Sequence, residues 1–246
     1  NYGINQNEAE QLKGSLAIIS RFKGLPHFEW IEEIQIRLED TFKLKNNFNT
    51  STVGFDHNPY LKGIEHFTGL FNSINNKVAL KINYKAFNKD FSIQILFHPW
   101  YLKQFNNRWF LFGFNEKYNA ISNYPLDRII DFEEIDGKYV ENQNLNFEEY
   151  FDDVIGVTVK GPEYVEKIVI KIDKELWPYI ESKPLHGSQK IKGNTEKDVT
   201  IELLLEINHE LIALLFSFID SIEVIEPKLL KDKFKVLSEK LYLKYN

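Results

Sequence analysis

The chain has 246 residues, of which 43% are hydrophobic and 27% are charged, so it can bury a packed core and is long enough for two domains. It contains no cysteine and its net charge is −6, which excludes disulfides and cysteine chemistry and argues against indiscriminate binding of polyanions over the whole surface. No apolar run reaches the length of a membrane-spanning helix, and the first residues include charges where a signal peptide would be apolar, so we expect a cytoplasmic protein.

The first 76 residues are predicted to form a helical connector. Asn5 and Glu8 have the spacing of a capping box, and the apolar stripes that follow predict a helical hairpin over residues 1–45. A third helix is expected from about Tyr60 to Asn76. Its apolar side would carry Ile64, Phe67, Phe71 and Ile74.

Residues 77–142 read as five short strands. Apolar residues alternate with polar ones over 78–87 and again from Phe91 to Phe97, whereas residues 109–114 are apolar throughout, as in a central strand. Trp109 and Leu111 are therefore expected in the core. Two further strands are predicted at 119–124 and 128–135. Five short strands separated by turns indicate a small β-barrel or a strongly bent sheet.

Strands and helices interleave in the C-terminal domain, residues 143–246. Asn208 is placed to cap one helix, and Pro227 opens the last. The predicted order ββαββαβα suggests a ferredoxin-like sandwich, so the whole chain belongs to the α+β class. Strands are expected at 154–160, 164–172, 188–193, 198–207 and 221–225, and the first helix of this domain at 173–180.

The positive charge of the chain is concentrated in one stretch. Residues 77–115 carry six cations and one anion, a net charge of +5, and the remainder carries −11. Attraction of a nucleic acid or another polyanion is one explanation. The others are that lysines on exposed strands favour solubility, or that they pack against acidic parts of this chain or of a partner subunit.

Motifs for catalysis are missing from the sequence. There is no glycine-rich nucleotide loop and no nucleophile elbow, and the six histidines are scattered. The fragment His209-Glu210 has Ala213 where a second zinc ligand would stand. We therefore expect no enzyme activity, no metal and no cofactor.

Three stretches together resemble one protein family. HPWYLKQFNNRWFLFGFN, from His98, followed by ISNYPLDRI, ending at Ile129, is similar to the signature of the WYL domain. LHGSQ at 185–189 and IEVIEPKLL at 222–230 are similar to the C-terminal extension that accompanies WYL domains. Two positions depart from the pattern: Phe110 replaces the usual Tyr, and Ser122 stands where many relatives have an Arg.

The resemblance implies a bacterial transcription regulator. Members of the family typically bind duplex DNA through an N-terminal winged helix-turn-helix, and sense a ligand with the WYL domain, an Sm-like or SH3-like β-barrel. In some relatives the ligand is single-stranded DNA or another nucleotide species. Residues 1–45 contain no recognisable winged helix-turn-helix and the chain does not begin with Met, so we expect a fragment that holds the sensing and assembly half, as a homodimer.

The candidate ligand-binding residues combine cations with aromatic rings. Cations attract phosphates whatever the sequence, and exposed rings stack on bases. His98 could instead end a strand, and Arg128 could merely pair with Asp127. The Ser122 departure removes a bidentate phosphate donor and leaves the ligand class open. The candidates are Lys81, Tyr84, Lys85, His98, Tyr101, Lys103, Arg108, Tyr124 and Arg128, with Trp100 as a further stacking platform.

A second hypothesis needs no small ligand. If the positive strip packs on acidic surface, the chain is a protein–protein interaction or dimerisation module. Binding of an oligonucleotide separates the two hypotheses.

Overall fold

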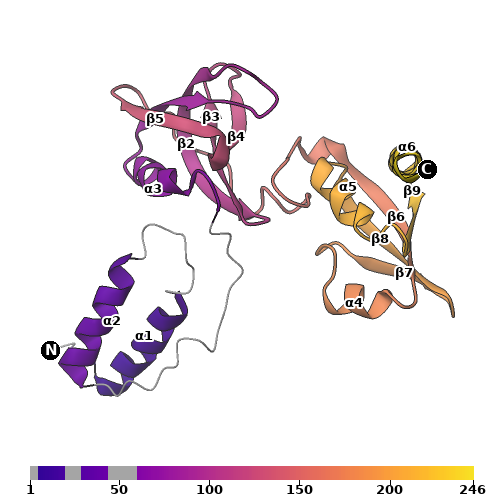
Figure 1. Ribbon diagram of the computed structural model, residues 1–246, viewed down its shortest axis with the longest axis horizontal. Helices are drawn as coiled ribbons and strands as arrows, with labels where there is room; N and C mark the ends of the chain where they lie inside the picture. Colours follow the sequence, from indigo (N-terminus) through magenta and orange to yellow (C-terminus); the bar gives the residue numbers. More distant parts are fainter. Residues whose placement is uncertain (1–4, 20–28, 44–59) are drawn as a thin grey trace. The chain divides into compact units, whose positions relative to one another are not determined.

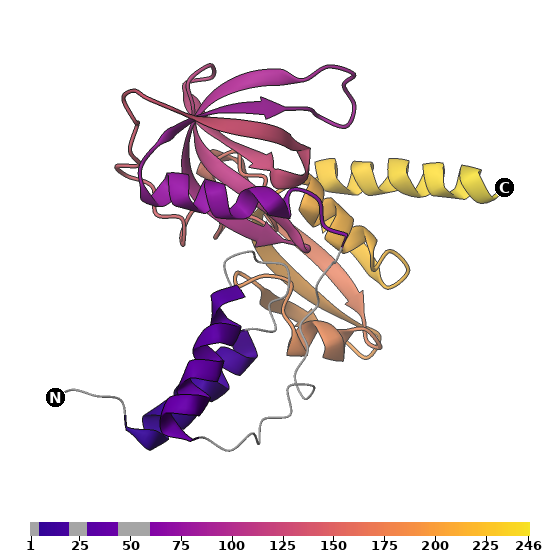
Figure 2. The ribbon, with the colours of Figure 1, turned by 60° about the vertical axis from the view of Figure 1, so that its left-hand side comes forward.

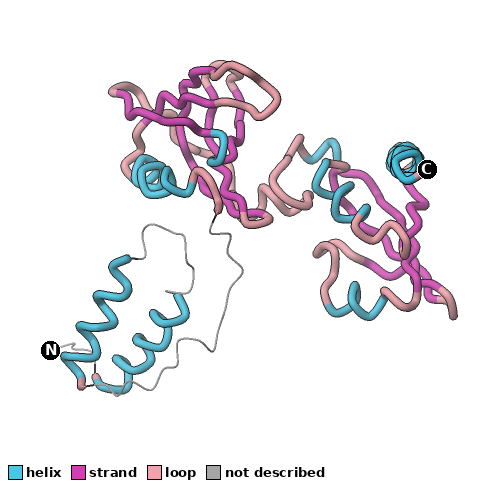
Figure 3. The backbone as a smooth tube through the Cα atoms, viewed as in Figure 1, coloured by secondary structure: helices cyan, strands magenta, loops and turns pink. Residues whose placement is uncertain are grey.

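The computed structural model describes residues 5–19, 29–43 and 60–246, and divides into two compact units, Asn1–Gln143 and Asn144–Asn246 (Figure 1). Each unit contains an antiparallel sheet and helices, so the architecture is α+β. In the second unit helices alternate with the strands, whereas the strands of the first unit follow one another (Figure 3).

Two antiparallel helices lie at the start of the chain, α1 (Gln6–Ile19) and α2 (Glu29–Phe42). The predicted capping box is confirmed, because the Asn5 side chain accepts from the Glu8 backbone N–H at 3.0 Å and the Glu8 carboxylate accepts from the Asn5 N–H at 2.9 Å. A buried ion pair between Lys13 and Glu39, 2.7 Å apart, joins the two helices.

The sheet of the first unit has the strand order β4-β3-β2-β1-β5. Among the described strands β4 and β5 are the edges and do not pair with each other, so the sheet is open and does not form the closed barrel that was one of the two predicted forms. A short helix, α3 (Phe67–Asn75), packs its buried Phe67 and Leu70 on one face. The strands are β1 (Ala79–Tyr84), β2 (Ile93–Phe105), β3 (Arg108–Asn115), β4 (Ala120–Pro125) and β5 (Ile129–Ile135).

A bulge in β2 changes which residues face the core. The register between β2 and β3 shifts between Pro99 and Tyr101, so that Phe97 before the bulge and Leu102 after it both face α3. Leu111 on β3 is fully buried and the Trp109 ring meets the Phe67 ring edge-on at 4.8 Å, which confirms the predicted core positions.

Two aromatic residues predicted to face the core are exposed. Phe91 is 63% exposed because it lies in the loop before β2, which begins only at Ile93. Phe71 is 42% exposed because α3 turns Phe67 and Leu70 inward, and its first turn is replaced by a 3-10 turn at Ile64–His66. Both predictions extended a periodic pattern beyond the element that carries it.

The sheet of the second unit has the strand order β7-β8-β6-β9, with every pair antiparallel. Its core lies on one face, where alternate residues of β6 and β8 meet buried side chains of the three helices. Asn208 caps α5 as predicted, accepting from the Leu211 N–H at 2.8 Å. The elements are β6 (Val165–Asp173), α4 (Trp177–Ser182), β7 (Lys190–Asn194), β8 (Asp198–Glu206), α5 (His209–Phe216), β9 (Ile222–Glu226) and α6 (Lys228–Tyr245).

The strand predicted at residues 154–160 is wrong. This segment is irregular, and the backbone N–H groups of Val157, Thr158 and Lys160 donate to two carboxylates and not to a neighbouring strand. Glu206, which is 1% exposed, accepts from the N–H groups of Lys160 and Gly161 at 2.8 and 3.0 Å. Glu210 accepts from the Thr158 N–H at 3.1 Å.

None of the described helices is long and apolar enough to cross a lipid bilayer. Within the same residue ranges, no three His, Asp or Glu side chains are grouped so that they could hold a metal ion.

Candidate ligand site

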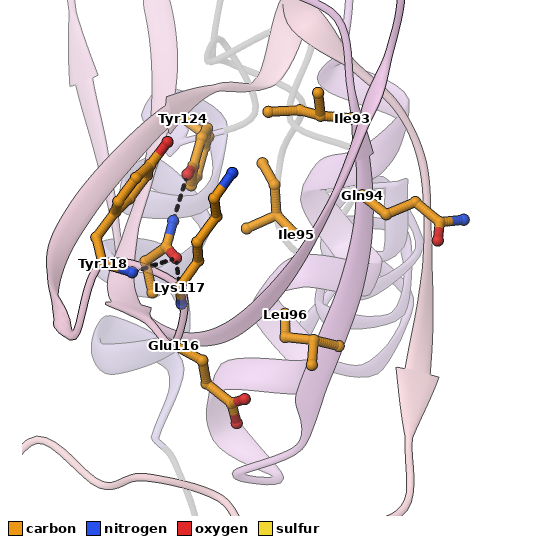
Figure 4. A pocket seen from close by; sticks show the side chains of 9 residues that line it. Ile93, Gln94, Ile95, Leu96, Glu116, Lys117, Tyr118 and Tyr124 are labelled. Carbon is orange, nitrogen blue, oxygen red and sulfur yellow. Dashed lines mark hydrogen bonds between the residues drawn. The ribbon is translucent and has the colours of Figure 1, made fainter.

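A pocket of about 300 Å³ opens on the first unit between the start of β2 and the turn that joins β3 to β4 (Figure 4). The volume is at the lower end of the range typical of small-molecule sites. The pocket is lined by Ile93, Gln94, Ile95, Leu96, Asn115, Glu116, Lys117, Tyr118 and Tyr124.

The buried side chain of Asn115 holds the lining of this pocket in place through three hydrogen bonds. Its side chain is 1% exposed, and its Oδ1 accepts from the backbone N–H groups of Lys117 at 3.0 Å and Tyr118 at 3.4 Å. Its Nδ2 donates to the Tyr124 hydroxyl at 2.6 Å. One buried amide therefore fixes both the turn and the orientation of the phenol behind it.

The pocket combines one cation and two phenols with an apolar wall, and its one carboxylate, Glu116, is engaged by His98 Nε2 at 3.0 Å. The side chains of Lys117 and Tyr118 extend alongside Tyr124, with Ile93 and Ile95 opposite them (Figure 4). The Lys117 ammonium lies 5.6 Å from the centre of the Tyr118 ring. Burial raises the pKa of Tyr124 above the ordinary value of a phenol. Such a wall can accept a flat ring and neutralise a negative group beside it.

Two arginines share a buried carboxylate near the end of β1. The Asp127 side chain is 8% exposed, and its Oδ2 lies 3.0 Å from Arg108 Nε, while its Oδ1 lies 3.9 Å from Arg128 Nε. Within the described residues neither that Oδ1 nor Arg128 Nε has a hydrogen-bond partner. The group carries a net charge of +1, and Lys85, whose N–H donates to the Arg128 carbonyl at 3.0 Å, is beside it.

The nine predicted site residues do not converge on one face. Lys81 pairs with Glu133 on β5 at 2.8 Å. Lys81 also lies opposite Leu96 of β2, and Lys103 follows Leu96 by seven residues, which at about 3.3 Å per residue is roughly 23 Å along the strand. Burial beside Phe110 lowers the pKa of Lys103. The structure brings together Lys85, Arg108 and Arg128 as one group and Tyr84 and Tyr124 as another.

His98 lies in the middle of β2 and does not end a strand, and both of its ring nitrogens are engaged by other parts of the chain. It is 1% exposed, its Nδ1 accepts from the Val140 N–H at 3.2 Å, and its Nε2 meets a Glu116 oxygen at 3.0 Å. This pattern makes Nε2 the protonated nitrogen. The Tyr139 hydroxyl donates to the Pro99 carbonyl, and burial raises the pKa of Tyr139 to about 12. His98 therefore anchors the segment after β5 on β2.

Two of the three predicted stacking rings, Trp100 and Tyr124, make contacts within the domain. Tyr124 is 9% exposed, and its ring meets those of Tyr84 and Phe97 edge-on at 4.9 and 5.2 Å. Trp100 donates its indole N–H to the Val140 carbonyl at 2.8 Å. Tyr101 is 37% exposed. The prediction that Tyr124 is an exposed stacking ring is wrong, although Tyr124 is one of the residues that line the pocket.

Lys117 and Tyr118 were not identified from the sequence, nor was Asn115. A short polar turn between two strands is ordinary, and nothing in its residues marks it as a site. The one pattern in the sequence that could have pointed to it is Asn115 at the end of an apolar strand, followed by the cation Lys117 two residues later and the aromatic Tyr118 three residues later.

Comparison with known proteins identifies both units. A family model of the WYL domain matches residues 65–134, and one of the WCX domain matches residues 164–242. No curated protein matches the chain. Solved structures similar to it include proteasome accessory factor B/C (PafBC) of Arthrobacter aurescens, at 15% identity and a TM-score of 0.32, covering 98% of this chain and 36% of that chain.

A CRISPR Cas-related protein is also similar, at 12% identity and a TM-score of 0.46, covering 74% of this chain and 51% of that one. The chain thus spans about a third and a half of the lengths of these two proteins. The resemblance inferred from the stretches at 98–129, 185–189 and 222–230 is confirmed by the two family matches. The chain is a WYL-domain protein in which a WCX domain follows the WYL domain.

Proposed function

We propose that the chain is the ligand-sensing and assembly part of a cytoplasmic bacterial transcription regulator, and that its WYL domain binds a nucleotide or a single-stranded nucleic acid. The proposal includes no catalytic step. Duplex DNA would be read by a different part of the regulator. The presence of a WYL domain followed by a WCX domain supports the regulatory role.

The pocket beside Tyr118 is the observation that supports a nucleotide or a single-stranded nucleic acid as the ligand. Its isoleucine wall and phenol rings suit the faces of a nucleobase, and Lys117 suits a phosphate. Ser122, in the position where many relatives have an arginine, lies beside the Tyr124 hydroxyl. Lys117 would supply the charge that Ser122 does not.

The arginine pair offers a second point of attachment for a polyanion. Arg108 and Arg128 share a single carboxylate, so one positive charge is left over to meet a phosphate. Both belong to the WYL domain, as does the pocket. A ligand with more than one phosphate would be favoured.

We also propose that the two sheets belong to the fold types that the sequence suggested. The spatial order β7-β8-β6-β9 supports a ferredoxin-like sandwich, as does the chain order, in which α4 follows β6 and α5 follows β8. The five-stranded order β4-β3-β2-β1-β5 supports an Sm-like or SH3-like sheet, left open between β4 and β5.

Replacing Lys117 by alanine tests the proposed ligand. A charge-assisted contact to a phosphate contributes about 1.5 to 3 kcal/mol, so the affinity for a nucleotide should fall roughly tenfold or more. Isothermal titration of the whole chain with nucleoside mono- and triphosphates at low salt measures this. Lys138→Ala, an exposed lysine outside the pocket, should leave the affinity unchanged. No binding by the unaltered chain, or equal losses from both variants, would refute the proposal.

A dimerisation module is the second candidate, and α6 favours it. A groove of about 630 Å³ between α5 and α6 has a largely apolar lining, and Val236, Tyr242 and Leu243 of α6 are 48%, 67% and 75% exposed. We propose a homodimer that uses this surface. Sedimentation should then give a concentration-dependent mass that Val236→Asp with Leu243→Asp returns to that of a monomer, whereas Lys240→Glu should not; a monomer at all concentrations would exclude this role.

A further inference from the structure

The loop between β1 and β2, residues 85–92, carries two exposed phenylalanine rings. Phe87 is 70% exposed and Phe91 is 63% exposed. Figure 2 shows this loop extending beyond the ends of the two strands. Single apolar side chains at a surface are ordinary, but two large rings in one eight-residue loop expose a concentrated apolar area to solvent.

The charges around these rings are positive. Lys85 and Lys89 lie in the loop with Asp90 as its one anion, and the Arg128 guanidinium lies 4.6 Å from the centre of the Phe87 ring. A protein interface core is usually depleted of lysine, whereas rings interleaved with cations are typical of surfaces that follow a nucleic-acid strand. The surroundings of the rings therefore indicate bases joined by phosphates.

The loop also connects the two parts of the candidate site. On one side Phe87 contacts Arg128 of the arginine pair. On the other, Phe91 is two residues from Ile93, which lines the pocket. A strand with one base in the pocket could continue over Phe91 and Phe87 and bring a phosphate to the arginines.

We propose that Phe87 and Phe91 are stacking platforms for unpaired bases, so that the WYL domain binds a single-stranded oligonucleotide more tightly than a mononucleotide. The inference rests on the proposed function and adds to it the length of the ligand. Paired bases offer no free face to these rings, so duplex of the same sequence should not gain from them. Stacking is tolerant of base identity, and the preference should be for length rather than for sequence.

The test compares ligands of two lengths on the whole chain. Fluorescence anisotropy with labelled thymidine mononucleotide and with oligothymidylate of about six nucleotides gives both affinities, since ring platforms act within site sizes of about 4 to 16 nucleotides. Phe87→Ala with Phe91→Ala should weaken hexanucleotide binding roughly tenfold or more and leave the mononucleotide affinity unchanged. Phe87→Tyr with Phe91→Tyr should bind the hexanucleotide as the unaltered chain does, and Phe87→Leu with Phe91→Leu should not.

The outcomes separate this inference from the proposed function. If the mononucleotide binds but the hexanucleotide gains nothing, or if the leucine variant binds like the unaltered chain, stacking by the loop is refuted and the pocket remains. If neither ligand binds at low salt, the proposed function fails and the inference fails with it. Ile130→Ala, at an exposed apolar residue of β5 outside the loop, serves as the matched control and should change neither affinity.

Discussion

Replacing Gly113 with alanine should destabilise the WYL domain by about 3 kcal/mol, because a β-carbon there has no space. It would lie 2.1 Å from the His98 carbonyl oxygen and 2.8 Å from the Phe97 ring. Gly113 faces Pro99 at the bulge of β2, where the two backbones come close. Neither the carbonyl nor the buried ring can move without breaking the pairing of β2 and β3.

Chemical denaturation followed by tryptophan fluorescence measures the change, since Trp100 and Trp109 lie in the first unit and Trp177 lies in the second. Gly193→Ala is the matched control, since Gly193 also lies in a strand beside a register shift and its β-carbon would be 3.7 Å from the nearest atom. It should change the free energy of unfolding by less than about 1 kcal/mol. Equal effects from the two substitutions would show that the close approach at Gly113 is unimportant.

Replacing Glu206 with alanine should destabilise the WCX domain by about 3 kcal/mol, because two backbone N–H groups would lose a charged acceptor. The carboxylate accepts from the N–H groups of Lys160 and Gly161 at the end of the irregular segment 154–161, here called the strap, and Glu210 accepts from the N–H of Thr158 before them. Burial raises the pKa of Tyr150, and the nearby charge of Glu206 adds to the effect. We expect the loss of stability to affect both the strap and the end of β8, where Glu206 lies.

Hydrogen exchange gives the test its resolution along the chain. In Glu206→Ala the amides of Lys160 and Gly161 should lose protection together with a fall in the unfolding free energy. Glu202→Ala, in the same strand, removes a half-buried carboxylate that pairs with the exposed Lys192, and should cost less than about 1 kcal/mol. Unchanged protection of the strap in Glu206→Ala would contradict the role assigned to the carboxylate.

Local patterns determined most of the elements and the family. The capping box at Asn5 and the cap at Asn208 depend on side chains three residues from their partners, so they could be read directly. The alternation in β1 and the apolar run of β3 follow from the two-residue repeat of a strand. The WYL and WCX stretches are contiguous, and they too required no knowledge of the fold.

Partners distant in sequence decided the rest. His98 became a buried anchor because Val140 reaches it, and residues 154–160 lost their strand to carboxylates on β8 and α5. The pocket depends on the hydrogen bond from Asn115 at the end of β3 to Tyr124 of the neighbouring strand β4, and Arg108 meets Arg128 through its ion pair with Asp127. A hydrogen-bond donor or a charge takes whichever acceptor the chain brings near it. The sequence alone therefore determined most of the elements, much of the core and the family, and the tertiary structure decided which polar groups meet and form a site.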